Sequence, residues 1–123
     1  MEKVTRFEDL HCWQSARALA RKVFVYSKQG ELGKDWDTRS QFRRAGLSVM
    51  NNIAEGFTRF SDREKIRFLE ISTSSGNEVK SMLYLFEDLA FLPQETILEL
   101  HQDTDKAINQ TIGLIRYLYR KGK

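Results

Sequence analysis

The sequence contains one cysteine and two histidines among its 123 residues. A single cysteine excludes an intramolecular disulfide and any zinc site built from several cysteines, and it is typical of a reducing compartment. One proline and seven glycines are too few for the turns of an all-β sandwich or barrel. The chain lacks a run of about 18 apolar residues, and its N-terminus lacks the apolar segment of a signal peptide. We therefore expect a cytoplasmic helical protein with no membrane segment.

What the sequence does contain suits one folded domain over residues 1–123, since 41% of the residues are hydrophobic and 30% are charged. The net charge of +3 is unevenly distributed: residues 1–67 carry +5, residues 68–115 carry −6 and residues 116–123 carry +4. Such a chain could bind a nucleic acid on a basic face or associate with copies of itself. An ordinary solvated surface with segregated charges is the alternative.

Apolar residues recur every three or four positions in four segments, as the buried stripe of a helix requires. The first segment predicts a helix from Glu8 to Lys28, followed by a loop over residues 30–35, which contain two glycines and no apolar repeat. The stripe of this helix comprises Leu10, Trp13, Ala16, Ala20, Val23 and Phe24.

A second helix is expected to begin with Asp37 or Thr38 as its N-cap and to end at Gly56, taken as the left-handed residue that follows many helices. Its stripe comprises Phe42, Ala45, Val49, Ile53 and Ala54. Small residues within it, Ala45, Gly46 and Ser48, would let a neighbouring helix approach closely.

Ser61 and Glu64 match the capping box that starts many helices, so a third helix is predicted from there to about Leu92. Its stripe comprises Phe68, Ile71, Ser72, Ser75, Val79, Met82, Phe86 and Leu89. Pro93 is tolerated in the first turn of a helix, so a fourth helix follows it and ends in a frayed basic tail over residues 120–123. The stripe of this helix comprises Ile97, Leu100, Thr104, Ala107, Thr111, Leu114, Ile115 and Leu118. The simplest arrangement is all-α, an up-down-up-down four-helix bundle.

Candidate catalytic and metal residues are few. Glu8 and His11 have the Glu-x-x-His spacing of di-iron bundles, but the other histidine, His101, has a leucine in place of the glutamate. Cys12 lies beside His11, yet adjacent residues on a helix do not face each other, so we interpret it as a half-buried structural cysteine. No Gly-x-Ser-x-Gly elbow or phosphate-binding glycine loop is present. We expect no enzymatic activity, no metal and no cofactor.

Basic and aromatic residues are the stronger signal. Arginines in the second helix and in the turn after it are interspersed with Phe57 and Phe60, as phosphate contacts and base stacking require. Alternatively, the two rings pack against the end of the bundle while the arginines pair with Asp62, with Glu64 or with a neighbouring subunit. The segment after the second helix also contains Lys65. The candidate nucleic-acid-binding residues are Arg39, Arg43, Arg44, Arg59, Arg63 and Arg67.

Residues 43–57 resemble the pattern of arginine, alanine and serine followed by Asn-Ile-Ala-Glu-Gly in proteins encoded within intervening sequences of bacterial 23S rRNA genes. The resemblance continues through Arg59 and Ser61 and covers nearly the whole chain. The loop over residues 33–36 lacks the Phe-Pro and Tyr-Gly-Leu elements of the pattern, and Ser72 stands where alanine is usual. We interpret most of the signature residues as architectural; they are Arg44, Ser48, Asn52, Ile53, Ala54, Glu55, Gly56, Ser75 and Glu78.

The resemblance implies a four-helix bundle that assembles into a ring-like homopentamer. It also implies similarity to the accessory variability protein of diversity-generating retroelements, a basic pentameric barrel that binds nucleic acid and a reverse transcriptase. Our leading hypothesis is therefore an oligomeric, non-enzymatic bundle that binds structured RNA or DNA through a basic face. The alternative is a scaffold that oligomerises and binds a protein partner without nucleic acid.

Overall fold

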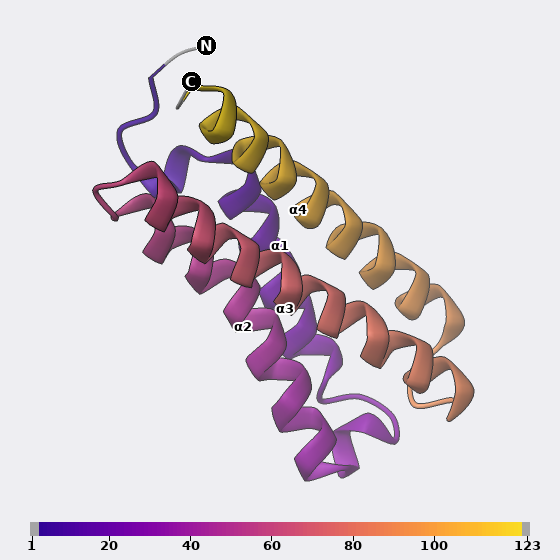
Figure 1. Ribbon diagram of the computed structural model, residues 1–123. Helices are drawn as coiled ribbons and strands as arrows, with labels where there is room; N and C mark the ends of the chain where they lie inside the picture. Colours follow the sequence, from indigo (N-terminus) through magenta and orange to yellow (C-terminus); the bar gives the residue numbers. More distant parts are fainter. Residues whose placement is uncertain (1–2, 122–123) are drawn as a thin grey trace.

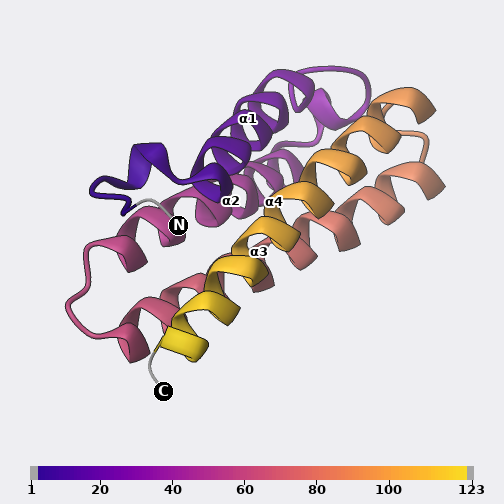
Figure 2. The same cartoon turned by 90° about the horizontal axis from the view of Figure 1, so that it is seen from above.

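The structure, a computed structural model, describes residues 3–121, and these residues form four long helices and no strand. The helices are α1 (His11–Tyr26), α2 (Trp36–Phe57), α3 (Asp62–Asp88) and α4 (Gln94–Lys121). Two single 3₁₀ turns, η1 (Phe7–Asp9) and η2 (Leu32–Lys34), precede α1 and α2. Each helix packs against its neighbours in the chain, and α1 also packs against α4 (Figures 1 and 2). The predicted four-helix bundle is confirmed.

The order of the helices brings distant segments together at the two ends of the bundle. Both ends of the described chain lie beside the turn between α2 and α3, whereas the α1–α2 and α3–α4 connections lie at the opposite end (Figure 1). This placement follows from the antiparallel order, because the first turn of α3 and the last turn of α4 must lie side by side. The antiparallel order therefore brings the charged side chains of the first turn of α3 close to those of the last turn of α4.

The core consists of the inward stripes of all four helices. The rings of Phe42 and Phe86 meet edge to face, with centroids 5.0 Å apart, and both are fully buried. Burying a side chain of this size stabilises the fold by roughly 1.5–3 kcal/mol. Buried serine and threonine hydroxyls donate hydrogen bonds to helix carbonyl groups, as Ser72 does to Val49 O at 2.7 Å and Thr104 to Leu100 O at 2.6 Å.

The start of the first helix differs from the prediction. Glu8 and Asp9 belong to η1, and Leu10 is extended with φ −73° and ψ 129°, so α1 begins only at His11 and ends at Tyr26 rather than Lys28. Acidic residues such as Glu8 and Asp9 are favoured in the first turn of a 3₁₀ helix and of an α-helix alike. Residue type alone therefore placed the start of the helix too early.

Both ends of the second helix also correct the sequence interpretation. The N-cap is Asp35, whose side chain accepts a hydrogen bond from Thr38 N at 3.1 Å, rather than Asp37 or Thr38. Gly56 is helical, and α2 continues through Phe57 to a right-handed cap. A Cβ at Gly56 would lie 3.0 Å from Phe68 Cβ, so this glycine permits close approach of α3 rather than a left-handed turn.

The third helix begins as predicted and ends earlier. Ser61 Oγ accepts from Glu64 N at 3.1 Å, which confirms the cap, while the Glu64 carboxylate lies 3.3 Å from Arg67 Nε. The helix ends at Asp88 rather than Leu92, and Ala90 adopts φ 55° in the turn that follows. At the C-terminus, the residues 120 and 121 that were expected to fray continue α4, whereas residues 122 and 123 lie outside the described range.

A second apolar stripe on α3 was merged with the core stripe in the sequence prediction. The core side of α3 includes Ile66, Leu69 and Leu83, whereas Ile71 and Leu89 point to solvent with exposed fractions of 38% and 51%. The two stripes run along the same helix at similar spacing, so periodicity alone did not separate them.

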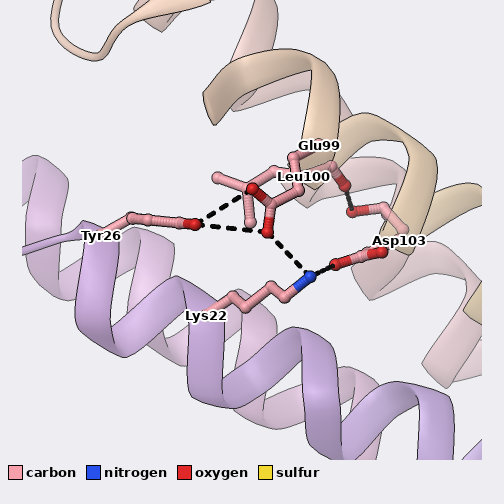
Figure 3. Close-up of polar contacts among 6 residues, drawn as sticks. Lys22, Tyr26, Glu99, Leu100 and Asp103 are labelled. Atoms are coloured by element: carbon pink, nitrogen blue, oxygen red, sulfur yellow. Dashed lines mark hydrogen bonds and ion pairs between the residues drawn. The ribbon is translucent and has the colours of Figure 1, made fainter. Parts of the chain in front are cut away.

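A polar cluster joins α1 to α4 on the outside of the core (Figure 3). Lys22 Nζ lies 2.6 Å from Asp103 Oδ2 and 2.8 Å from Glu99 Oε2, and the Tyr26 hydroxyl donates to Glu99 at 3.0 Å. The hydrogen bonds to Asp103 and Glu99 raise the pKa of Lys22 above its usual value. The hydrogen bonds from Lys22 and Tyr26 lower the pKa of Glu99. This cluster fixes the α1–α4 spacing and is not close to the candidate site.

Candidate nucleic-acid interface

The turn between α2 and α3 is held by hydrogen bonds on both sides. Thr58 Oγ1 donates to Glu55 O at 2.8 Å, and Arg59 N donates to Gly56 O at 3.1 Å. The Ser61 cap holds the other side. The four-residue turn is therefore anchored at the helix on either side, and it places Arg59 and Phe60 at the end of the bundle.

Two arginines of this region share one aromatic ring. The guanidinium carbons of Arg59 and Arg67 lie 4.5 Å and 5.1 Å from the centroid of Phe68. Each also meets a carboxylate, with Arg59 Nη2 3.7 Å from Glu55 Oε1 and Arg67 Nε 3.3 Å from Glu64 Oε2. Such exposed contacts are weak individually, on the order of 1 kcal/mol or less, but they orient the two guanidinium groups.

The fold adds basic residues that the sequence interpretation did not assign to the site. The last two turns of α4 carry Arg116, Arg120 and Lys121, and Lys121 Nζ lies 3.7 Å from Asp62 Oδ1 in the first turn of α3. The signal was the run of basic residues after position 115, and the antiparallel pairing of the last two helices brings three of them, Arg116, Arg120 and Lys121, to the α2–α3 turn. We call this combined surface the basic end; it comprises Arg59, Arg63, Lys65, Arg67, Arg116, Arg120 and Lys121.

A groove of about 830 Å³ runs between the first turns of α3 and the last turn of α4. Arg63 and Arg67 line one side, and Leu118 and Tyr119 line the other. Arg63, Arg67 and Tyr119 are exposed, and Arg63 has no ion pair within residues 3–121. Three carboxylates, those of Asp62, Glu64 and Glu70, also line the groove, which therefore combines cationic, aromatic and acidic side chains.

The remaining predicted arginines lie elsewhere. Arg39 donates to Gly33 O at 3.1 Å and lies over the Trp36 ring at 4.4 Å, while Arg43 Nε donates to the buried Ser27 Oγ at 2.8 Å. At a rise of 1.5 Å per residue, these two positions are about 20–27 Å along α2 from Phe57. Both side chains connect α2 to the end of α1 and the η2 turn. The structure therefore does not bring all six predicted arginines into one patch.

Arg44 directly follows Arg43 on α2, is exposed, and has no ion pair in the described part of the chain. Among the other signature positions, Ser48, Gly56 and Ser75 lie where α2 meets α3. Ser48 Oγ lies 2.7 Å from Ser75 Oγ, and Asn52 Nδ2 donates to Ser48 O at 2.9 Å. Ile53 is fully buried and Ala54 is half-buried, while Glu78 is exposed on α3.

The residues considered for catalysis differ in their exposure. Cys12 is buried, and burial raises the pKa of its thiol to about 11. His11 is exposed at the start of α1. Within the described residues no cluster of three or more histidine, cysteine, aspartate or glutamate side chains could hold a metal ion. None of the described helices has the length and apolar character needed to cross a membrane.

Comparisons with known proteins give the family and the fold. The family model for 23S rRNA-intervening sequence proteins matches residues 8–113. A solved structure from the S23 ribosomal protein family of Bacteroides thetaiotaomicron, described as a protein with unknown function, superposes with a TM-score of 0.77 at 20% identity. The superposition covers 85% of this chain and 97% of that one. No curated protein matches the chain.

Proposed function

The chain belongs to the 23S rRNA-intervening sequence protein family, and we propose that it is a non-enzymatic, cytoplasmic bundle that binds structured RNA or another nucleic acid through its basic end. The observation that carries this proposal is the meeting of two basic segments, residues 59–67 and 116–121, at one end of the fold.

The charge balance of that end supports phosphate binding. The basic end has seven cationic side chains, and the four carboxylates that lie among or beside them are Glu55, Asp62, Glu64 and Glu70. The excess is therefore three positive charges, equal to the net charge of the whole chain. Clustered cations of this kind attract a polyanion through release of its counterions, and the attraction falls steeply with salt.

The fixed orientation of Arg59 and Arg67 also supports the proposal. The Phe68 ring and the neighbouring carboxylates orient Arg59 and Arg67 before any ligand arrives, which lowers the entropy lost on binding. Each carboxylate contact is exposed, so a phosphate can displace it at small cost. Arginine then offers two parallel N–H donors to phosphate oxygens.

A titration of a fluorescently labelled RNA hairpin and a DNA duplex at two salt concentrations tests this function. The test variant combines Arg63→Gln, Arg116→Gln and Arg120→Gln, three exposed cations of the basic end. The matched control removes the same total charge from exposed cations elsewhere and carries Arg21→Gln, Lys28→Gln and Lys106→Gln.

For duplex DNA, the salt slope of the test variant should become shallower by up to about three relative to wild type, because each lost phosphate contact contributes about 0.9. The control variant should keep a slope near that of wild type. Equal losses in the two variants would mean that net charge alone drives binding and would contradict the proposed interface. Failure of the wild type to bind either ligand at low salt would reject the function.

Self-association is a second part of the proposal, and the outward stripe of α3 supports it. Leu85 and Leu89 are about half exposed, at 48% and 51%, on the face away from the core. Exposed apolar rows of this kind often mark contacts between subunits. We propose a homo-oligomer, with the pentamer suggested by the family resemblance as the expected size. The exposed positions Ile71, Glu78 and Leu85 follow the seven-residue spacing of helix–helix seams, and Leu89, the C-cap of α3, lies one turn beyond them.

The same stripe favours the alternative function, a scaffold that oligomerises and binds a protein partner such as a reverse transcriptase without nucleic acid. Light scattering on a sizing column tests whether it mediates assembly. Leu85→Glu with Leu89→Glu should reduce the mass toward that of one chain, whereas Leu98→Glu, at an equally exposed position of α4, should not. An unchanged mass in the double variant would remove the stripe from the subunit contact. An intact oligomer that ignores RNA would favour the scaffold.

A further inference from the structure

The side chain least explained by the fold is Phe60, whose ring is fully exposed at the tip of the α2–α3 turn. Other rings nearby have partners, since Lys65 Nζ lies 5.5 Å from the Phe57 centroid and two guanidinium groups lie over Phe68. Within residues 3–121, by contrast, the ring of Phe60 has no aromatic or cation–π partner. Both of its faces are open to a ligand.

The backbone on either side of the ring is held in place. The backbone on its N-terminal side is fixed by the bonds from Thr58 and Arg59 to carbonyl groups of α2, and the residue after it is the Ser61 cap of α3. The turn therefore presents Phe60 without needing to be ordered by a partner, and pre-ordering of this kind favours binding. A ring needed only to fill the bundle end would pack inward, as Phe57 does.

The charges around the ring select the kind of partner. Arg59 directly precedes Phe60, and Arg63 is the second residue of α3, after the acidic Asp62. Tyr119 is exposed across the groove from Arg63. Nucleic-acid bases stack on aromatic rings while the adjoining phosphates contact arginines, so a ring flanked by arginines suits a nucleotide whose base is free.

We propose that Phe60 stacks on an unpaired base, so that the ligand of the basic end is a nucleic acid with unpaired nucleotides, such as a hairpin loop, a bulge or a single strand. This inference rests on the proposed function and names the part of the nucleic acid that the site recognises. A continuous duplex stacks its bases on one another and offers no free base face away from its ends, so it would gain only the phosphate contacts.

Anisotropy titrations with three labelled RNAs at one salt concentration test the inference. The RNAs are a hairpin with an unpaired loop, a blunt duplex of the same stem, and a single strand of the loop sequence. A DNA single strand of the same sequence tests whether binding depends on the ribose. The proteins are wild type, Phe60→Ala, Phe60→Trp and the control Trp36→Ala, which removes another exposed ring at the opposite end of the bundle.

Phe60→Ala should weaken binding of the hairpin and the single strand by about 5- to 150-fold, the loss expected for one stacked base, and leave the duplex unchanged. The salt slope should stay the same because no charge is removed. Phe60→Trp should bind the unpaired ligands at least as tightly as wild type, and Trp36→Ala should match wild type. Because Phe60 is fully exposed, the variant should retain the helical signal and unfolding midpoint of wild type.

Three results would overturn the inference, and they separate it from the proposed function. Hairpin binding by Phe60→Ala within twofold of wild type would reject stacking while leaving phosphate binding in place. A change in oligomer mass on Phe60→Ala would assign the ring to a contact with a second copy of the chain instead. If the wild type binds none of the RNAs at low salt, the proposed function and the inference fail together.

Discussion

The close packing of α3 against α4 makes a quantitative prediction at Gly76. A Cβ built there would lie 2.7 Å from Ile108 Cγ1 and 2.9 Å from its Cδ1, distances that real Cβ atoms essentially never show. Gly113, in the middle of α4, has nothing within 4 Å of the same added atom. Both glycines are inside helices, so alanine at either position gains helix propensity of roughly 0.8–1 kcal/mol.

The two substitutions should therefore differ by their packing alone. Gly113→Ala should stabilise the protein by about 0.5–1 kcal/mol. Gly76→Ala should gain the same stabilisation from helix propensity but lose about 1–3 kcal/mol of unfolding free energy to overpacking. Its free energy of unfolding should therefore be about 1–3 kcal/mol lower than that of Gly113→Ala. Urea unfolding followed by circular dichroism at equal protomer concentrations measures the difference, since an oligomer's stability depends on concentration.

The Ile108 side chain should account for the clash. Combining Gly76→Ala with Ile108→Ala should be less destabilising than the sum of the single substitutions, because truncation of Ile108 removes the atoms that the new methyl group would meet. If Gly76→Ala and Gly113→Ala have equal stabilities, α3 and α4 do not approach as closely as described, and the reasoning is refuted.

Two further predictions concern buried or clustered groups. Lys22→Met should lower the urea midpoint at about pH 7, while Lys106→Met, at an exposed site of α4, should not. The lowered pKa of Glu99 contributes stability that is present above its ordinary value of 4.5 and is lost as the pH falls through the lowered pKa, so the effect of Lys22→Met should shrink progressively below pH 4.5. The raised pKa of Lys22 keeps its own contribution until strongly alkaline pH. Cys12, buried with a thiol pKa of about 11, should resist an aromatic disulfide reagent at about pH 8 in the folded protein and react in urea.

The helices could be predicted from the sequence because each carries a long apolar stripe, but their ends depended on local hydrogen bonds. The Ser61 cap has a clear signature and was found, whereas Asp35 competed with Asp37 and Thr38, which are equally good caps by residue type. The role of Gly56 depends on how closely Phe68 approaches, a distance set by the packing of two helices and absent from either stripe.

Only part of the basic end could be predicted from the sequence. Arg59, Arg63 and Arg67 come from one segment and stay together, but Arg116 and Arg120 join them only through the antiparallel order of α3 and α4. Conversely, arginines 39 and 43 fit the same residue pattern and are engaged by Gly33 O and Ser27 Oγ. Residue type identified the cations, and tertiary contacts determined which of them remain open to a ligand.

Hydrogen–deuterium exchange of the protein with and without an RNA hairpin tests the location of the interface most directly. The account predicts slower exchange on RNA addition in peptides covering residues 58–67 and 116–121, with little change over residues 28–44. Protection confined to residues 28–44, around Arg39 and Arg43, would contradict it. So would a bound RNA that protects neither segment of the basic end.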